Sequence, residues 1–208
     1  MEAGKPGWYD ALNGLPGLFG ASLAEACELV RLLVFLRTAL RERDLPAAAV
    51  ELPVELVDLL DAITHAMHQH PDDTFAYWDA VSTAREDYRA RIRLGFDGAA
   101  RAITFRDLDQ TFATYEQRLN AGIDRATMLN DGIPPTYVAY SAERYDVLKT
   151  TAGRTTVRIT DFAPHLLPLF LEGAVRALKI APAPAAAQQL HVQVRESALF
   201  DRALQMYK

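Results

Sequence analysis

Four stretches of the sequence repeat apolar residues every three or four positions, and this period restricts the fold more than any other feature. The stretches predict helices over residues 22–43, 53–70, 72–95 and 104–129. The first begins with a capping box, because the Ser22 hydroxyl can accept from the amide of Glu25. Pro53 suits the first turn of the second helix, and Gly95 suits a left-handed cap after the third. The pattern therefore predicts long helices joined in hairpins.

The second part of the chain changes character after the break at residues 132–135. Two stretches rich in Thr, Val and Tyr predict a two-stranded antiparallel excursion over residues 136–147 and 155–162. An apolar stretch through residue 180, a Pro/Ala connector over 181–187 and a last helix or helix pair over 187–204 complete the outline. We therefore predict a mainly α fold, layered or toroidal, with a small two-stranded β insertion rather than an α/β sheet.

Composition excludes several classes of function. The 208 residues carry a net charge of −5, which argues against a nucleic-acid partner. No apolar run reaches the length of a membrane span, and the N-terminus lacks the features of a signal peptide. The single cysteine, Cys27, cannot form an internal disulfide and lies in an apolar helical run. We expect a buried, inert thiol and a cytoplasmic protein without a membrane partner.

The segment over residues 4–20 reads GKPGWYDALNGLPGLFG and predicts an ordered loop. Its glycines and prolines exclude a regular helix or central strand, while its aromatic residues are too apolar for a solvated linker. Trp8 and Tyr9 offer flat faces that can stack on sugar rings, and Asp10 and Asn13 add a carboxylate and an amide beside them. Such a loop either lines a site or caps a core as an ordered surface segment.

Three histidines, His65, His68 and His70, cluster at the end of the second predicted helix. The first two could face one metal, but no nearby cysteine completes a ligand set. Imidazoles near a helix C-terminus more often complement the helix dipole or face solvent. We therefore expect no metal site there.

Four segments resemble the large bacterial sugar phosphorylases of glycoside hydrolase family ninety-four, the cellobiose phosphorylase-like proteins. They are the loop with the following SLAEACELVRLL, then YWDAVSTAREDYRARIRLGFDG, PLFLEGAVRALKI and RESALFDRALQMYK. The similarity is greatest to the 1,2-β-oligoglucan phosphorylase branch. In that family the catalytic domain is an (α/α)6 barrel with its site at the loop-rich end.

The resemblance implies that residues 1–208 are an internal piece of such a barrel. Its parts would be an active-site loop (1–21), helical hairpins (22–131), a β insertion (132–165) and a closing segment with a helix (166–208). The implied reaction is inverting phosphorolysis of β-linked gluco-oligosaccharides to α-glucose 1-phosphate, with inorganic phosphate as co-substrate and no other cofactor. The family also implies a homodimer in the full-length form.

The chemistry needs only one carboxyl group, because phosphate is already a nucleophile. Asp10 is the only carboxylate between residues 4 and 20, and apolar surroundings would raise its pKa toward the range of a general acid. Better-known relatives carry Asp-Trp-Asn-Asp-Gly-Met-Asn with the first Asp as the acid. Aligned on Trp8, that first Asp falls on Gly7 and the second on Asp10. Asp10 is therefore either the displaced acid or a brace that bonds nearby amides.

Other candidates for the site follow from the same resemblance. Trp8 and Tyr9 would pack on substrate, although Trp8 could instead anchor the loop in the core, and Asn13 would bond a sugar hydroxyl. Glu172, within PLFLEG, would either reach the substrate or act as a buried helix-capping carboxylate. Arg154 and His165 are conceivable phosphate partners, but we expect the main phosphate ligands outside this chain.

Two other readings of the sequence stay open. The chain is alternatively a non-catalytic helical domain that binds carbohydrate or a protein partner. The other reading is that the chain folds poorly alone, because a piece of a barrel would leave barrel-facing helix surfaces unpaired, which predicts exposed apolar patches and self-association.

Overall fold

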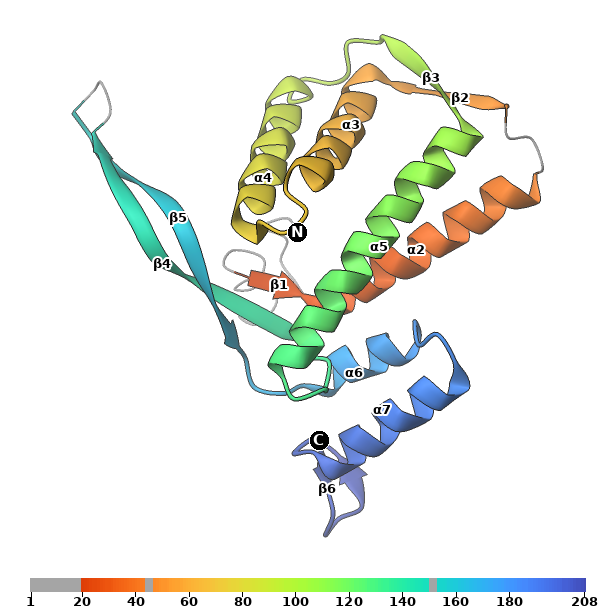
Figure 1. The fold of residues 1–208 in the computed structure, drawn as a ribbon, viewed down its shortest axis with the longest axis vertical. Helices are drawn as coiled ribbons and strands as arrows, with labels where there is room; N and C mark the ends of the chain where they lie inside the picture. Colours follow the sequence, from red (N-terminus) through yellow and green to blue (C-terminus); the bar gives the residue numbers. More distant parts are fainter. Residues whose placement is uncertain (1–19, 44–46, 150–152) are drawn as a thin grey trace. The chain divides into compact units, whose positions relative to one another are not determined.

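The computed structural model describes residues 20–43, 47–149 and 153–208. They form helices and small antiparallel sheets, in two compact units (Figure 1). Among these residues, unit 1 comprises residues 20–31 and 119–208, and unit 2 comprises Leu32–Arg118. The helix α2 (Leu23–Glu42) crosses the boundary after residue 31, and the helix α5 (Phe105–Leu129) crosses the boundary after residue 118. The predicted helices are confirmed, but the described part of the chain mixes them with several small antiparallel sheets, so a mainly α fold is only partly correct, and no closed helical toroid is seen there.

Unit 1 contains the predicted strand pair. β4 (Tyr137–Lys149) and β5 (Thr155–Leu166) form a long antiparallel hairpin, and both strands extend beyond the predicted ends. The short strand β1 (Gly20–Ser22) pairs with the start of β4, so that Gly20 lies opposite Ala139. β4 is thus the centre of a three-stranded sheet at its base and one strand of a two-stranded ribbon beyond it.

The C-terminal part of unit 1 differs from the prediction. α6 (Leu171–Leu178) and α7 (Pro184–Glu196) are followed by the hairpin of β6 (Phe200–Asp201) and β7 (Met206–Tyr207). The prediction of a connector through residue 187 and a helix to residue 204 was wrong at both ends. Pro184 begins the helix, because a proline at the first helical position loses no hydrogen bond. The segment after Glu196 forms the β6–β7 hairpin.

Unit 2 contains the helical hairpin of α3 (Val54–Gln69) and α4 (Thr74–Arg91). A second strand pair, β2 (Ala49–Pro53) and β3 (Ala100–Thr104), lies beside it. The prediction of a single two-stranded insertion was therefore wrong, because it missed this pair. α4 also ends before the predicted Gly95. Gly95 has the expected positive φ of 114°, but its amide donates to the carbonyl of Ile92 in a turn after the helix.

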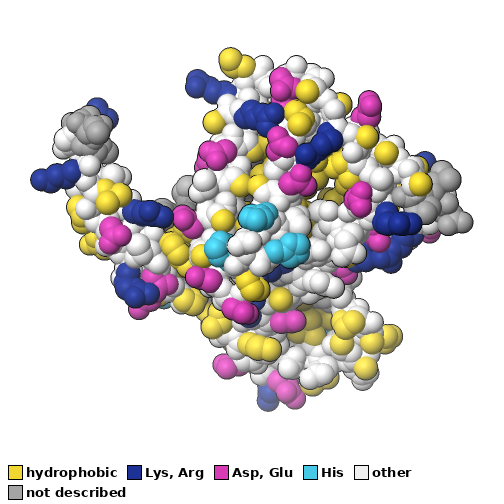
Figure 2. All heavy atoms as spheres, turned by 45° about the horizontal axis from the view of Figure 1, so that its top comes forward, with side chains coloured by type: hydrophobic (Ala, Val, Ile, Leu, Met, Phe, Trp, Pro, Cys, Tyr) yellow, Lys and Arg dark blue, Asp and Glu magenta, His cyan; other side chains and the backbone are white. Residues whose placement is uncertain are grey.

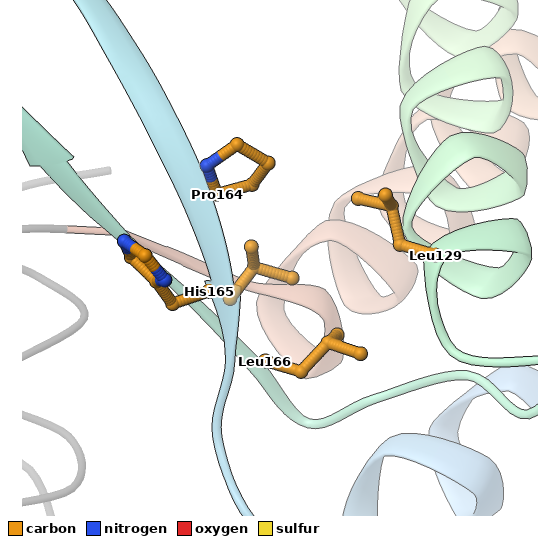
Figure 3. A pocket seen from close by; sticks show the side chains of 5 residues that line it. Leu129, Pro164, His165 and Leu166 are labelled. Carbon is orange, nitrogen blue, oxygen red and sulfur yellow. The ribbon is translucent and has the colours of Figure 1, made fainter. Parts of the chain in front are cut away.

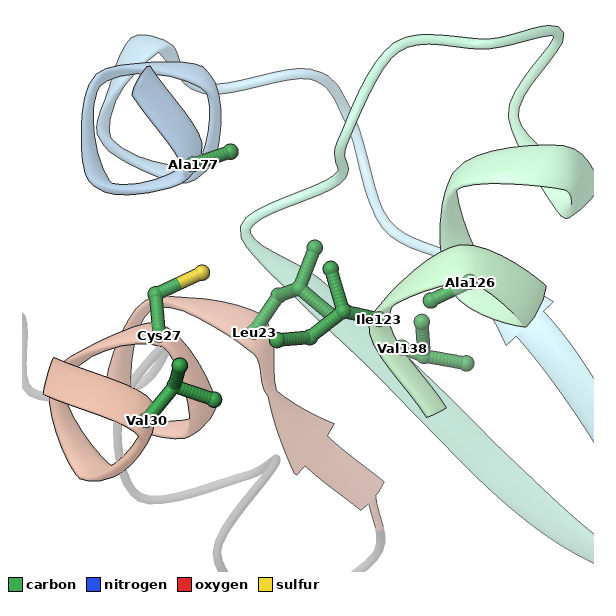
Figure 4. Close-up of a cluster of buried hydrophobic side chains, with 7 residues drawn as sticks. All are labelled: Leu23, Cys27, Val30, Ile123, Ala126, Val138 and Ala177. Atoms are coloured by element: carbon green, nitrogen blue, oxygen red, sulfur yellow. The ribbon is translucent and has the colours of Figure 1, made fainter. Parts of the chain in front are cut away.

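The apolar core of unit 1 joins the first turns of α2 to α5, α6 and the base of β4 (Figure 4). Its buried members are Leu23, Cys27, Val30, Ile123, Ala126, Val138 and Ala177. Cys27 is fully buried, and burial raises the pKa of its thiol to about 11. The expected burial of the thiol is confirmed, and the raised pKa keeps nearly all of it protonated at neutral pH.

Parts of the helical surface remain apolar. In unit 2, Leu32, Val34 and Phe35 of α2 are all exposed, and Phe35 retains 67% of its accessible surface. Figure 2 shows hydrophobic side chains between charged ones over the surface in view. None of the described helices is both long and apolar enough to cross a lipid bilayer.

Candidate functional site

The four candidate residues of the N-terminal loop, Trp8, Tyr9, Asp10 and Asn13, lie outside the described residues. What the structure describes is the scaffold that follows the loop in the chain. Gly20 begins β1, and Ser22 ends it directly before α2. The Ser22 hydroxyl accepts a hydrogen bond from the amide of Glu25 at 3.2 Å, as the capping box predicts.

Thr136 is the centre of a junction that fixes this scaffold. It is almost completely buried, and its carbonyl accepts from the amide of Leu23, the first residue of α2, at 2.9 Å. Its hydroxyl donates to the carbonyl of Phe170 at 2.7 Å and accepts from the amide of Gly173 at 2.9 Å. One threonine therefore ties the start of α2 to the start of α6.

Gly173 allows α6 to lie directly on this junction. A Cβ atom at residue 173 would meet the Pro135 carbonyl and the Thr136 nitrogen at 2.6 Å, a separation that real Cβ atoms do not show. No side chain fits there without moving the backbone. The glycine of the PLFLEG segment is therefore explained by close packing against residues 135 and 136.

Glu172 lies in the first turn of α6 and belongs to a network of charges. Its Oε1 accepts from Nη2 of Arg176 at 3.2 Å, and Nη1 of Arg176 donates to Oε1 of Glu28 on α2 at 2.6 Å. Lys179 approaches the same oxygen of Glu28 at 3.7 Å. The hydrogen bond from Arg176 is the main cause that lowers the pKa of Glu28. These contacts bring the PLFLEGAVRALKI segment against SLAEACELVRLL.

This environment bears on one of the two readings of Glu172, the buried helix-capping carboxylate. Its side chain is 30% exposed, and no side chain caps α6 at Phe170. The buried helix-capping carboxylate is therefore not observed. Oε1 is used by Arg176, while Oε2 has no hydrogen-bond partner among the described residues and can accept from a ligand.

A hollow of about 320 Å³ lies at the base of the hairpin (Figure 3). It is lined by Leu129, Val138, Pro164, His165 and Leu166. In the close-up, the His165 ring points to the opposite side of β5 from Pro164 and Leu166. The hollow therefore presents mainly apolar side chains from α5, β4 and β5, which suits an apolar group rather than phosphate.

His165 is bonded to Ser141 instead, with 2.7 Å between its Nε2 and the Ser141 Oγ. It lies opposite Ala139, which in turn lies opposite Gly20, so the histidine shares a sheet row with the first residue of β1. From the sequence, His165 was only a conceivable phosphate partner, and nothing in the sequence pointed to Ser141. The two residues meet because of the register in which β4 pairs with β5. The alternation of side chains along each strand does not reveal that register.

The predicted histidine cluster lies at the end of α3, where His65 and His68 are exposed and His70 follows the last helical residue. Figure 2 shows histidine side chains gathered on the face in view. Within the described residues, no group of three or more His, Cys, Asp or Glu side chains is placed to hold a metal ion.

Comparison of this chain with models of known protein families and with curated protein sequences finds no match.

Proposed function

We propose that this chain carries part of the catalytic domain of an inverting phosphorylase that acts on β-linked gluco-oligosaccharides. The reaction would transfer a glucosyl unit to inorganic phosphate and release α-glucose 1-phosphate. The fold would be a segment of an (α/α)6 barrel, with the described helices as barrel helices. The four-segment resemblance to glycoside hydrolase family ninety-four suggests this assignment.

One structural observation supports the proposal best: two segments that carry the resemblance pack on each other in unit 1. The segment after the loop and the PLFLEG segment meet at Thr136 and through the contact of Arg176 with Glu28. A functional loop needs a rigid base, because a binding constellation must be held within a fraction of an ångström. The buried hydrogen bonds of Thr136 and the tight packing of Gly173 supply such a base directly after the loop.

Within this proposal each candidate residue has one role. Asp10 protonates the leaving glycosidic oxygen, Trp8 and Tyr9 pack on the sugar rings, and Asn13 bonds a hydroxyl. Glu172 accepts from a sugar hydroxyl with Oε2, while Arg176 holds its other oxygen. Phosphate then attacks the anomeric carbon from the opposite face, which inverts its configuration.

The test is the release of α-glucose 1-phosphate from β-1,2-gluco-oligosaccharides in phosphate buffer. Asp10→Asn should lower the rate at least a hundredfold, the usual contribution of a general acid. Asp124→Asn is the matched control, because Asp124 is an exposed aspartate on α5. Equal rates in wild type and Asp10→Asn would contradict the role of Asp10. A folded chain that binds the oligosaccharide without turnover fits both a fragment whose phosphate ligands lie outside these residues and the alternative, a non-catalytic carbohydrate-binding domain.

A further inference from the structure

A second hollow lies in unit 1, at the end of α7 and beside the β6–β7 hairpin. Its volume is about 370 Å³, within the range of small-molecule sites. We call it the arginine hollow, and it is lined by Val192, Arg195, Glu196, Phe200, Arg202 and Gln205. None of these residues has a role in the reaction proposed above.

The charges of the arginine hollow favour an anion. Arg195 and Arg202 contribute two guanidinium groups, and neither forms an ion pair within the described residues. Glu196 contributes one carboxylate, which leaves the lining with a net positive charge in a protein of net charge −5. The partial negative charge at the C-terminal end of α7 is offset by Arg195. Arg202 is therefore the cation that is most available to a ligand.

Arg195 is held in place before any ligand binds. Its guanidinium carbon lies 4.8 Å from the centre of the Phe200 ring, a cation–π contact. The Tyr207 ring packs edge-on against the same Phe200, with 5.1 Å between the ring centres. The Tyr207 hydroxyl is bonded in turn to Nε2 of His191 at 2.7 Å. These contacts hold the Phe200 ring in place, and the Arg195 guanidinium packs against that ring.

Arg202 lies on a braced turn. Oδ1 of Asp201 accepts from the amides of Ala203 and Leu204, both at 3.0 Å. Gln205 adopts a φ of 54°, a left-handed conformation that is uncommon for a residue with a side chain, and its Nε2 donates to the carbonyl of Arg202 at 2.6 Å. Such strain gathers at functional sites when the surrounding structure enforces it.

The remaining lining groups specify the rest of the ligand. Guanidinium groups bind phosphate oxygens with two parallel hydrogen bonds. The Glu196 carboxylate and the amide oxygen of Gln205 can accept from hydroxyl groups, and Val192 offers an apolar contact for ring carbons. We propose that the arginine hollow binds a phosphorylated sugar, with the phosphate on Arg202 and Arg195 and the hydroxyls toward Glu196 and Gln205. This site is independent of the proposed phosphorolysis and would remain if that reaction were absent.

The test is an NMR titration of the whole chain that follows the arginine Nε–Hε signals. The probes are α-glucose 1-phosphate, inorganic phosphate and glucose. We expect the signals of Arg202 and Arg195 to shift with α-glucose 1-phosphate, to shift less with inorganic phosphate and to stay unchanged with glucose. Arg202→Gln should weaken the sugar phosphate about tenfold, as for loss of one charge-assisted pair. Arg195→Gln should weaken binding of the sugar phosphate less, because the charge of Arg195 is already used in part to offset the partial negative charge at the C-terminal end of α7.

Arg106→Gln is the matched control, since Arg106 is an exposed arginine of unit 2. The proposal is overturned if the Arg202 signal does not shift, or if both hollow variants bind like wild type. Equal binding of inorganic phosphate and α-glucose 1-phosphate would overturn the sugar part of it. Asp10→Asn should leave this titration unchanged, so that a failure of the hollow and a failure of the proposed reaction are distinguishable.

Discussion

The two units are stabilised by different kinds of contact. Unit 1 is joined by buried, short-range contacts: the hydroxyl of Thr136, the missing side chain of Gly173 and the apolar cluster around Cys27. Unit 2 joins α2 to α5 by ion pairs, in which Arg37 bonds Asp109 at 3.0 Å and also Glu116, and Arg41 bonds Asp109. Buried contacts fix geometry more strictly than partly exposed ion pairs do. We infer that unit 1 provides the rigid base for the loop.

The largest effect is expected at Gly173. Gly173→Ala should lower the free energy of unfolding by roughly 3 kcal/mol, because the new methyl group meets backbone at 2.6 Å. Gly122→Ala is the control, since Gly122 lies inside α5 and a Cβ atom added there would approach only Nη2 of the Arg125 side chain, at 4.0 Å. That change should stabilise by about 0.5–1 kcal/mol through helix propensity. Similar unfolding curves for both variants would contradict the tight junction.

Thr136→Val should have the next largest effect. The substitution keeps the shape but removes the hydroxyl that bonds the Phe170 carbonyl and the Gly173 amide, at a cost of about 2–3 kcal/mol. Thr156→Val, on the exposed part of β5, should change stability by less than about 0.5 kcal/mol. Denaturant unfolding of the two variants measures the difference. An equal loss of stability in both would contradict the role of Thr136 at the junction.

Arg37→Gln tests unit 2. It should lower the free energy of unfolding by about 1.5 kcal/mol, because the ion pairs are only partly buried. This loss is smaller than the loss expected for Gly173→Ala or Thr136→Val. Burial by itself raises the pKa of Asp109, but the hydrogen bonds from Arg41 and Arg37 and their charges outweigh it, so the pKa lies below its usual value. The stability from this pair is therefore present at neutral pH and is lost as pH falls below about 4, through the lowered pKa.

The measurement is unfolding at pH 7 and pH 3, with and without added salt. Wild type should lose more stability on acidification than Arg37→Gln does, and salt should reduce the difference between them. An equal acid loss in both proteins would show that the pairing of Arg37 with Asp109 contributes nothing.

The smallest effect is expected at Cys27. Because the thiol is fully buried and its pKa is about 11, a thiol reagent at pH 7.5 should not react with the native chain. Reaction should begin only where denaturant opens unit 1. Fast labelling of the native protein would contradict the closed core of unit 1.

Sequence reasoning succeeded where contacts are local. The predicted α3 and α5 differ from the observed helices by about one residue at each end, and Ser22 caps α2 as expected. It failed where distant segments decide the structure. β2 and β3 pair Ala49 with Thr104, and strands of five residues give too little periodicity to detect. The junction at Thr136 was missed for the same reason, because its partners are far apart in the chain.

The same distinction applies to the candidate site. Residue chemistry identified Glu172, but only the fold shows that Arg176 occupies one of its oxygens. The arginine hollow was not predicted, since Arg195 and Arg202 come together only through the β6–β7 hairpin. Trp8, Tyr9, Asp10 and Asn13 stay predictions from the sequence.

The most direct test of the central claim, that the loop before unit 1's junction binds β-glucan, uses tryptophan fluorescence. The chain has two tryptophans, so Trp78→Phe leaves Trp8 as the only one. Titration of this folded variant with β-1,2-gluco-oligosaccharide should change the Trp8 emission in a saturable way, while a β-linked galactan should not. No change with the gluco-oligosaccharide, in a protein whose circular dichroism shows the native helices, would contradict the account.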